Sequence, residues 1–366
     1  MSCLSEAGPV RLRSAPPGGR SPEFVQVSTA AAITLGAIPG RMHRCGSTQC
    51  LNLLLTYPEG CRANCSYCGL ARHRDAKTDY AERNFIRVDW PTLRLDDMLA
   101  RVAAVQPSPF ERMCISMITH PSAEADTLAI LKAWRAVSPI PVSILSNPTT
   151  MVRADIQALH DEGADIFTVS LDAATEPLFA EHRGRSRRSP HKWRKYWDVF
   201  AHARDIFGPG RIGMHIIVGL GETDRDVLTI CRDLHAQGGH SHLFCFFPER
   251  GSLLAHLPAP PRGRWRRIQL ARYLIEYANH PFAALHFDHA GALTDFGLPP
   301  AALAPIIATG LPFRTSGCPG ATRPDLSACN RPYGDSPPSD IASYPYAPHS
   351  DDMAHITTQL ADIAVD

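Results

Sequence analysis

The sequence predicts an α/β fold built as a partial (β/α)6 TIM-like barrel with N- and C-terminal extensions. Six short, continuously apolar runs have the length and hydrophobicity of strands that are buried on both faces. Amphipathic stretches of helical length separate these runs, and such alternation is typical of a parallel sheet. Hydrophobic residues make up 44% of the 366-residue chain, which is enough for a sizeable core. A doubly wound sheet fits the same alternation.

The elements follow one another in a regular order. The six expected strands cover residues 51–57, 113–119, 142–146, 166–171, 214–219 and 242–247. The helices between them are expected at 95–105, 125–137, 153–162, 192–207 and 224–237, several ending near Gly or Pro. Beyond the sixth strand the pattern predicts a helix at 264–279, a strand at 284–287 and a helix at 300–309. The chain is therefore expected to repeat one strand–helix unit and then to leave the barrel.

Composition sets the expected boundaries. Residues 1–40 are expected to form a flexible tail and a lead-in, because their first half is rich in Pro, Gly, Ser and Arg. Residues 41–250 would hold the barrel, and 251–333 would form an extension over its mouth. Residues 334–366 have the same tail-like composition with one short helix at the end.

Charge and cysteine content narrow the function. With 37 Lys and Arg against 36 Asp and Glu, the net charge is +1, so no global field draws the chain to nucleic acid or to a membrane. An apolar run long enough to span a bilayer and a compact signal peptide are both missing, so a cytoplasmic location is expected. Disulfides are rare there, so the 11 cysteines point to metal binding or catalysis.

The sharpest motif is a cysteine triad directly after the first expected strand. Cys61, Cys65 and Cys68 lie within eight residues on one loop. Thiolate is the usual ligand of iron–sulfur clusters, and three thiolates leave one iron of a 4Fe–4S cluster open to another ligand. Active sites of barrels also lie on the loops that follow the strands. A zinc site is the alternative, but zinc sites usually show paired C-x2-C halves and a fourth ligand.

The spacing C-x3-C-x-aromatic-C, with Tyr67 as the aromatic residue, resembles the signature of the radical S-adenosylmethionine (SAM) enzymes. The resemblance implies a 4Fe–4S cluster on Cys61, Cys65 and Cys68 whose open iron binds SAM. Electron transfer then cleaves SAM to methionine and a 5′-deoxyadenosyl radical, which abstracts hydrogen from unactivated carbon. It also implies an electron donor such as ferredoxin or flavodoxin.

Further segments resemble the SAM-binding parts of that family. Ile217, Gly219 and Glu222 match part of its G-x-I-x-G-x-x-E motif, although His215 replaces the first Gly. Ser170 and Asp172 resemble the Asn-x-Asp that holds the SAM ribose in biotin synthase-like members. Arg183 lies near the exit of the fourth strand and is a candidate for the SAM carboxylate. The glycine-rich segment expected after the second strand is replaced by 119–124.

A second group of cysteines suggests an auxiliary iron–sulfur cluster. Cys45 and Cys50 resemble part of the C-x4-C-x5-C run of lipoyl synthases, and Ser316 resembles their C-terminal serine ligand. The third upstream cysteine is missing, and Cys318 or Cys329 is expected to replace it. Buried, unconnected thiols are the alternative. Cys114 lies in an expected strand and should pack there, although biotin synthase holds a 2Fe–2S cluster on strand cysteines.

These resemblances are closest to the two-component, biotin synthase-like lipoyl synthases. They imply sulfur insertion at unactivated C–H positions of an octanoyl chain on a carrier protein, in cooperation with a second radical SAM enzyme. One alternative is a radical SAM enzyme with another outcome, namely rearrangement, methylation or peptide modification. The other is a non-catalytic iron–sulfur scaffold, which would not cleave SAM.

Overall fold

A single mixed sheet organises the chain. The computed structural model describes residues 19–45, 48–74, 86–105 and 107–361. Its main sheet has eight strands in the order β3-β1-β2-β4-β5-β6-β7-β8, and all pairs from β2 to β8 are parallel. The sheet does not close, since β3 and β8 have no partner beyond them within the described residues. The predicted partial barrel is confirmed.

The six parallel strands coincide with the six apolar runs. They are β2 (Cys50–Leu55), β4 (Arg112–Ser116), β5 (Val142–Ser146), β6 (Ala164–Asp172), β7 (Ile212–Val218) and β8 (His240–Cys245). Most of their residues are buried, as expected for a sheet covered on both faces. Their carboxyl ends meet at one edge of the sheet, where a parallel barrel places its site.

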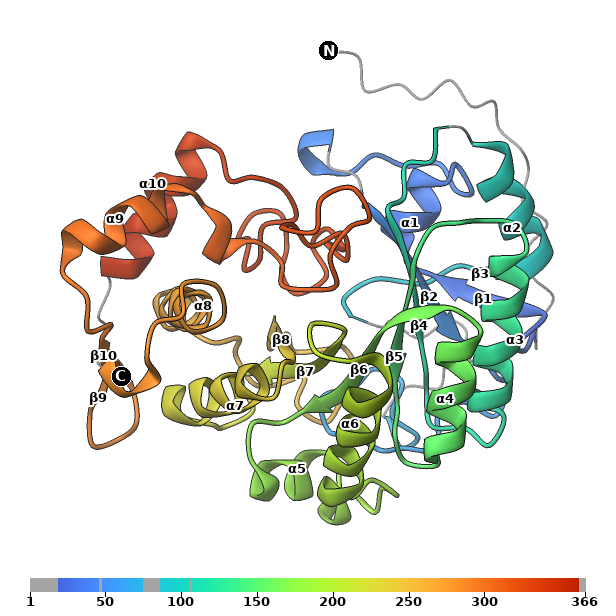
Figure 1. Ribbon diagram of the computed structural model, residues 1–366, viewed down its shortest axis with the longest axis horizontal. Helices are drawn as coiled ribbons and strands as arrows, with labels where there is room; N and C mark the ends of the chain where they lie inside the picture. Colours follow the sequence, from blue (N-terminus) through green and yellow to red (C-terminus); the bar gives the residue numbers. More distant parts are fainter. Residues whose placement is uncertain (1–18, 46–47, 75–85, 106, 362–366) are drawn as a thin grey trace.

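Helices cover the outer face of this sheet (Figure 1). They are α2 (Leu95–Ala104), α3 (Ala123–Arg135), α4 (Arg153–Asp161), α6 (Trp193–Phe207) and α7 (Asp224–Ala236). Each begins and ends within two residues of the expected helix. One further helix, α5 (Glu176–His182), was not predicted because it is only seven residues long.

The N-terminal extension is part of the sheet. β1 (Phe24–Val27) pairs antiparallel with β2 and with β3 (Thr92–Arg94), and α1 (Thr29–Thr34) follows β1. All four β1 residues are buried. Residues 19–40, expected as tail and lead-in, therefore include an ordered strand and helix that were too short to give a periodic signal. The part of the expected tail over 1–18 lies outside the described residues.

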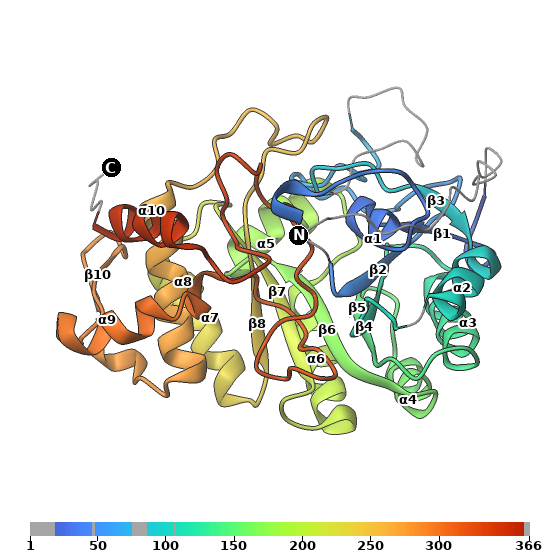
Figure 2. The same ribbon diagram turned by 90° about the horizontal axis from the view of Figure 1, so that it is seen from above.

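The C-terminal extension returns to the barrel. α8 (Arg262–Tyr277), the pair β9 (His286–Phe287) and β10 (Leu293–Asp295), and α9 (Pro300–Ala308) precede a long loop and α10 (Ser350–Ala361). In Figures 1 and 2 this loop runs along the inner side of the sheet, opposite the outer helices. No helix in the described part of the chain has the length and apolarity needed to cross a bilayer.

Residues 334–349 are packed, although their composition resembles a tail. Ile341, Ala342 and Tyr344 are buried beside α8. Trp265 Nε1 donates to the Ala342 carbonyl at 2.8 Å, and Arg266 Nη2 donates to the Ile341 carbonyl at 2.6 Å. Side chains of α8 thus donate hydrogen bonds to backbone carbonyls of this segment that are not paired within a sheet or a helix. These bonds order a segment that is poor in apolar residues.

Candidate active site

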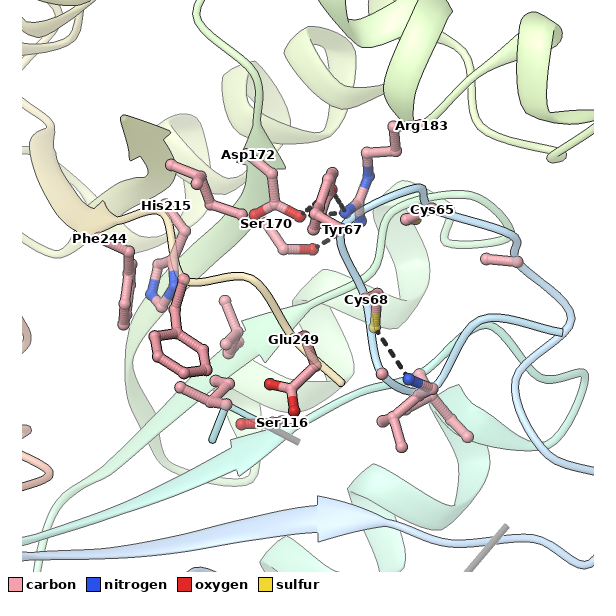
Figure 3. Close-up of a pocket in the computed structure, with 18 of the residues that line it drawn as sticks. Cys65, Tyr67, Cys68, Ser116, Ser170, Asp172, Arg183, His215, Phe244 and Glu249 are labelled. Atoms are coloured by element: carbon pink, nitrogen blue, oxygen red, sulfur yellow. Dashed lines mark hydrogen bonds and ion pairs between the residues drawn. The ribbon is translucent and has the colours of Figure 1, made fainter. Parts of the chain in front are cut away.

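A cavity of ≈ 180 Å³ lies at the carboxyl ends of the parallel strands. The three thiols of the triad line it together with side chains from β4 to β8, and its walls are mainly apolar. Figure 3 shows Cys65 and Cys68 on one side of the cavity and His215 and Phe244 on another. The structure therefore brings the motif of the first strand–helix unit to the ends of the other strands.

His182 holds the triad loop at Ser66. The Ser66 amide donates to the His182 carbonyl at 2.8 Å, and Ser66 Oγ lies 3.0 Å from His182 Nδ1. His182 Nε2 lies 2.9 Å from the Leu220 carbonyl, which links the loop to the turn after β7. Sequence reasoning missed this role of His182, because the residue lies in a run of basic residues typical of solvated surface. The apolar residues Leu178 and Phe179, three and four positions before His182, were the sequence signal that could have indicated burial of His182.

The triad thiols accept backbone hydrogen bonds. The Ala63 amide donates to Cys61 Sγ at 3.4 Å, and the Leu70 amide donates to Cys68 Sγ at 3.4 Å. Such bonds to sulfur are a usual feature of iron–sulfur sites and tune their potential. Burial raises the pKa of Cys65 to about 11 and that of Cys68 well above its ordinary value. Ligation has to offset this effect, because only the thiolate binds metal.

A polar network lies beside the triad and includes Tyr67 of the triad loop. Tyr67 Oη donates to Asp172 Oδ2 at 2.6 Å, and Arg183 pairs with the same carboxylate. Arg183 also donates to Tyr67 Oη at 2.7 Å and to Ser170 Oγ at 3.1 Å. Burial opposes the Arg183 charge, but Asp172 and two phenols outweigh it and raise the Arg183 pKa. Four residues predicted to bind the cofactor thus form one connected group (Figure 3).

Backbone geometry aims Asp172 into this network. The residue has φ of 67°, and the pairing of β6 with β7 shifts register between Ser170 and Asp172. Left-handed backbone is uncommon outside glycine, although Asp tolerates it better than most residues. Bulges and strained residues gather next to functional sites because they redirect a side chain. The backbone at Asp172 therefore has the kind of strain that is typical of functional sites, and it directs the side chain into the network.

The partial SAM motif has two different roles in the structure. Ile217 lines the cavity. Glu222 instead folds back on its own turn, where it accepts the amides of Gly219 at 2.7 Å and Leu220 at 2.8 Å. Arg264 binds the same carboxylate at 3.1 Å. Gly219, with φ of 117°, has no room for a Cβ, which would lie 2.6 Å from Pro260. Glu222 and Gly219 therefore shape the turn rather than the cavity wall.

Sequence reasoning missed five polar residues that line the cavity. They are Ser116, Asn147, His215, Glu249 and Asp335. Ser116 ends β4 and Asn147 directly follows β5, and this position at the carboxyl end of a parallel strand was the signal that could have found them. Burial raises the pKa of Glu249, and burial lowers the pKa of His215 to about 4. His215, noted only as a mismatch to the motif, stacks on Phe244 with ring centroids 5.0 Å apart.

The residues predicted to bind a second cluster are only partly brought together. Cys50, Cys318 and Cys329 converge inside the barrel, and Cys114 joins them. Ser316 does not, since its hydroxyl accepts from the Leu243 amide at 2.8 Å. Cys45 lies in a short helical turn (His43–Cys45), and its side chain is outside the described residues.

Neither cysteine group is arranged as a finished metal site. Within the described residues, no three His, Cys, Asp or Glu side chains are spaced to hold a metal ion. The donor sets nevertheless fit iron–sulfur chemistry, because each group consists of thiols on barrel strands or adjoining loops. Ligation in either group therefore requires rotation of cysteine side chains.

Comparison with known proteins gives a family match. Residues 55–234 match the model of the radical SAM superfamily. No curated protein sequence matches the chain. Among solved structures, methylornithine synthase (PylB) is 13% identical with a TM-score of 0.45, over 63% of this chain and 61% of that one. The hydrogenase maturase HydG from Carboxydothermus hydrogenoformans is 17% identical with a TM-score of 0.49, over 68% and 55%. The methyltransferase TsrM from Kitasatospora setae is 12% identical with a TM-score of 0.38, over 58% and 39%.

Proposed function

Because residues 55–234 form a radical SAM superfamily domain, we propose that this protein is a radical SAM enzyme that inserts sulfur into an apolar substrate. The observation that carries the proposal is the position of the triad. Cys61, Cys65 and Cys68 face a mainly apolar cavity, and the polar network of Tyr67, Asp172 and Arg183 lies beside Cys65. A cluster on these thiols would therefore have polar groups for a cofactor and apolar walls for a substrate in one cavity.

The triad fits a 4Fe–4S cluster with one open iron. Three thiols from one loop line the cavity, and two of them accept backbone amides. When bound, the cluster and SAM supply the one-electron cleavage of SAM and a carbon-centred radical. An external electron donor is required for this chemistry, and ferredoxin or flavodoxin is the class proposed.

The chain's own residues would orient the cofactor. Both hydrogen bonds from Tyr67 and Arg183 end on Asp172 Oδ2, which leaves Oδ1 available to a ribose hydroxyl. Ser170 Oγ donates to the Ser146 carbonyl at 2.9 Å and receives Arg183, so its position is fixed before ligand arrives. Arg183 is already ion-paired with Asp172. Its proposed role is therefore to position the Asp172 carboxylate, and not only to bind the SAM carboxylate.

The apolar walls favour a hydrocarbon substrate. Met117, Ile118 and Phe246 line the cavity beside the triad. A group without polar handles gains from burial there and leaves its C–H bonds in a dry site. This supports an acyl chain, such as an octanoyl group on a carrier protein, as the substrate of sulfur insertion. A second radical SAM enzyme acting on the same chain belongs to the same proposal.

The first experiment measures SAM cleavage. The protein is reconstituted anaerobically with iron and sulfide, reduced with dithionite and given SAM. Formation of 5′-deoxyadenosine and methionine is expected from the wild type and not from a variant with Cys61, Cys65 and Cys68 changed to Ala. Equal turnover in both would refute the assignment of the triad.

The second experiment separates sulfur insertion from other radical outcomes. An octanoyl-lysine peptide is added, and its mass is followed. Mono- or dithiolated peptide is the expected product. Deoxyadenosine formation without any thiolated peptide would contradict sulfur insertion on this substrate and leave the radical SAM assignment intact.

A further inference from the structure

Four cysteines from distant parts of the sequence meet inside the barrel, below the cavity. Two lie on neighbouring barrel strands and two on the C-terminal loop, and together we call them the four-thiol site. Its members are Cys50, Cys114, Cys318 and Cys329. Cys50, Cys114 and Cys318 are at most 5% exposed.

Direct contacts join these thiols. Cys329 shares hydrogen bonds with the thiols of both Cys50 and Cys114. Cys114 and Cys318 each bond to the hydroxyl of Ser143 on β5. The four sulfurs therefore form one continuous polar group rather than four separate core residues.

The fold builds this group with specific anchors. Asn52 lies opposite Cys114 in the register of β2 and β4, and Cys50 lies opposite Arg112. Across the C-terminal loop, the Cys329 amide donates to the Cys318 carbonyl at 3.2 Å. A Cβ at Gly317 would lie 3.1 Å from the Cβ of Cys329, so only glycine allows the loop to fold this tightly. Arg112 Nε holds the loop by donating to the Pro319 carbonyl at 2.6 Å.

Polar side chains surround the thiols. Asn52 Nδ2 donates to Cys50 Sγ at 3.3 Å and to Cys329 Sγ at 3.4 Å. Two arginines, Arg112 and Arg331, lie close enough to act on the cysteine charges. Within the described residues, Arg331 Nε is buried without a hydrogen-bond partner.

The four-thiol site also opens toward the substrate. Cys114 and Cys329 line a cavity of ≈ 50 Å³, and seven of its lining residues also line the cavity of the triad. His215 is one of these shared residues, so it lines both cavities. A structural zinc site fills its coordination with four protein ligands and gains nothing from an opening toward the reaction cavity.

We propose that the four-thiol site binds a second iron–sulfur cluster beneath the substrate. Four cysteine ligands in one place are typical of zinc or iron–sulfur sites, and the opening toward the radical cavity favours the cluster. The metal site stands on its own contacts, while its use as a sulfur donor rests on the proposed function. Cys45 and Ser316 are not ligands in this proposal.

The test removes the triad and asks what iron remains. A full-length variant with Cys61, Cys65 and Cys68 changed to Ser is reconstituted with iron and sulfide. Iron, acid-labile sulfide and zinc are counted, and the cluster is characterised by Mössbauer and EPR spectroscopy. In this background we expect one cluster to persist and to disappear with C114S or C329S. The matched control is C231S, a cysteine that is fully buried in α7. It should keep the iron.

Several outcomes would overturn the proposal. Loss of all iron in the triad variant, stoichiometric zinc without sulfide, or full iron retention in C114S would each do so. Loss of iron in C45S or S316A would also contradict the ligand set. Melting temperatures of the metal-free variants show whether a loss reflects unfolding. Wild-type protein that holds this cluster and yields no thiolated product would instead count against the proposed function alone.

The cluster should also change the C-terminal loop physically, which is a readout that does not depend on activity. Two ligands lie on the barrel and two on the loop, so binding ties residues 314–336 to β2 and β4. Limited proteolysis in that loop is expected to slow on loading of the triad variant. No slowing on loading would contradict the ligation of Cys318 and Cys329.

Discussion

Arg183 and Asp172 are the residues on which the cofactor side of the cavity depends. Their side chains are 5% and 13% exposed, and the arginine also holds Tyr67 and Ser170. A buried ion pair adds little net stability, but removal of one partner leaves an uncompensated charge in a low-dielectric site. The pair is therefore sensitive to any single substitution.

The first prediction concerns this pair. Arg183→Met is expected to lower the free energy of unfolding by about 3 kcal/mol, because Asp172 loses its counterion. Urea denaturation of the metal-free protein measures the change. Arg153→Met, which removes an exposed pair with Asp205 at 3.5 Å, is the control and should cost less than about 1 kcal/mol. Equal losses in both variants would contradict a special role for Arg183.

The second prediction concerns His191, which is 4% exposed. Burial and the nearby Arg183 charge lower the pKa of His191 well below its ordinary value. Below about pH 6.5 the imidazole is protonated in the unfolded chain but not in the folded protein. The free energy of unfolding therefore keeps its full value above about pH 6.5 and decreases as the pH falls below it. Between pH 7.5 and 5.5, the free energy of unfolding of His191→Gln should decrease by about 1.4 kcal/mol less than that of the wild type.

Urea midpoints at both pH values measure this difference. Glutamine does not titrate and can still form a hydrogen bond with Tyr196 Oη, which lies 2.9 Å from His191 Nδ1. His256→Gln, at an exposed position, is the control. An unchanged pH dependence in His191→Gln would show that His191 is protonated in the folded protein.

At the scale of elements, the turn between β7 and α7 positions one wall of the site. Glu222 closes this turn, and the next residue begins α7 with a capping box. Thr223 Oγ1 accepts the Asp226 amide at 3.1 Å, and Asp226 Oδ2 accepts the Thr223 amide at 2.9 Å. The exchange satisfies two amide donors that the first turn of a helix otherwise leaves unpaired.

The third prediction tests this cap. Thr223→Ala should lower the free energy of unfolding by about 1 kcal/mol, the usual effect of losing an N-cap side chain. Chemical denaturation followed by circular dichroism gives the value. Thr358→Ala, on the exposed part of α10, loses no cap and serves as the comparison. A Thr223→Ala variant as stable as the wild type would mean that water replaces the cap at no cost.

At the scale of the whole molecule, the C-terminal segment completes the barrel. Arg266 on α8 is fully buried, and burial lowers its pKa to about 10. Its guanidinium donates to the carbonyls of Ile341 and Ala342 and to Gln359 on α10. One side chain thus ties α8 to both the returning loop and the last helix, and the loop carries half of the four-thiol site.

The fourth prediction follows from this connection. Arg266→Met removes the donor to the buried Ile341 carbonyl, which costs about 1–3 kcal/mol, and one of the donors to the Ala342 carbonyl, so residues 337–346 should detach before the barrel unfolds. Hydrogen–deuterium exchange should increase in that segment and stay unchanged in β5. Lys132→Met, at a side chain that is 57% exposed, is the control. Uniform exchange over the whole chain would contradict a locally opening segment.

Two things could be read from the sequence because their signals are local. The six parallel strands follow from continuous apolar runs, and five of the outer helices follow from amphipathic periodicity. The triad follows from three cysteines within eight residues, since such spacing places all three on one loop whatever surrounds it. Short elements such as α5 and β1 were not predicted, because so few residues cannot show a hydrophobic periodicity.

Only the tertiary structure decided which distant residues meet. The register of β2 and β4 brings Cys50 and Cys114 to the same face, and the path of the C-terminal loop adds Cys318 and Cys329. The same holds for Arg183, which the sequence indicated only as a candidate for the SAM carboxylate and which is buried against Asp172. The physical reason is that spacing along the chain determines local structure, while grouping across it depends on strand register and on which backbone groups each loop can satisfy.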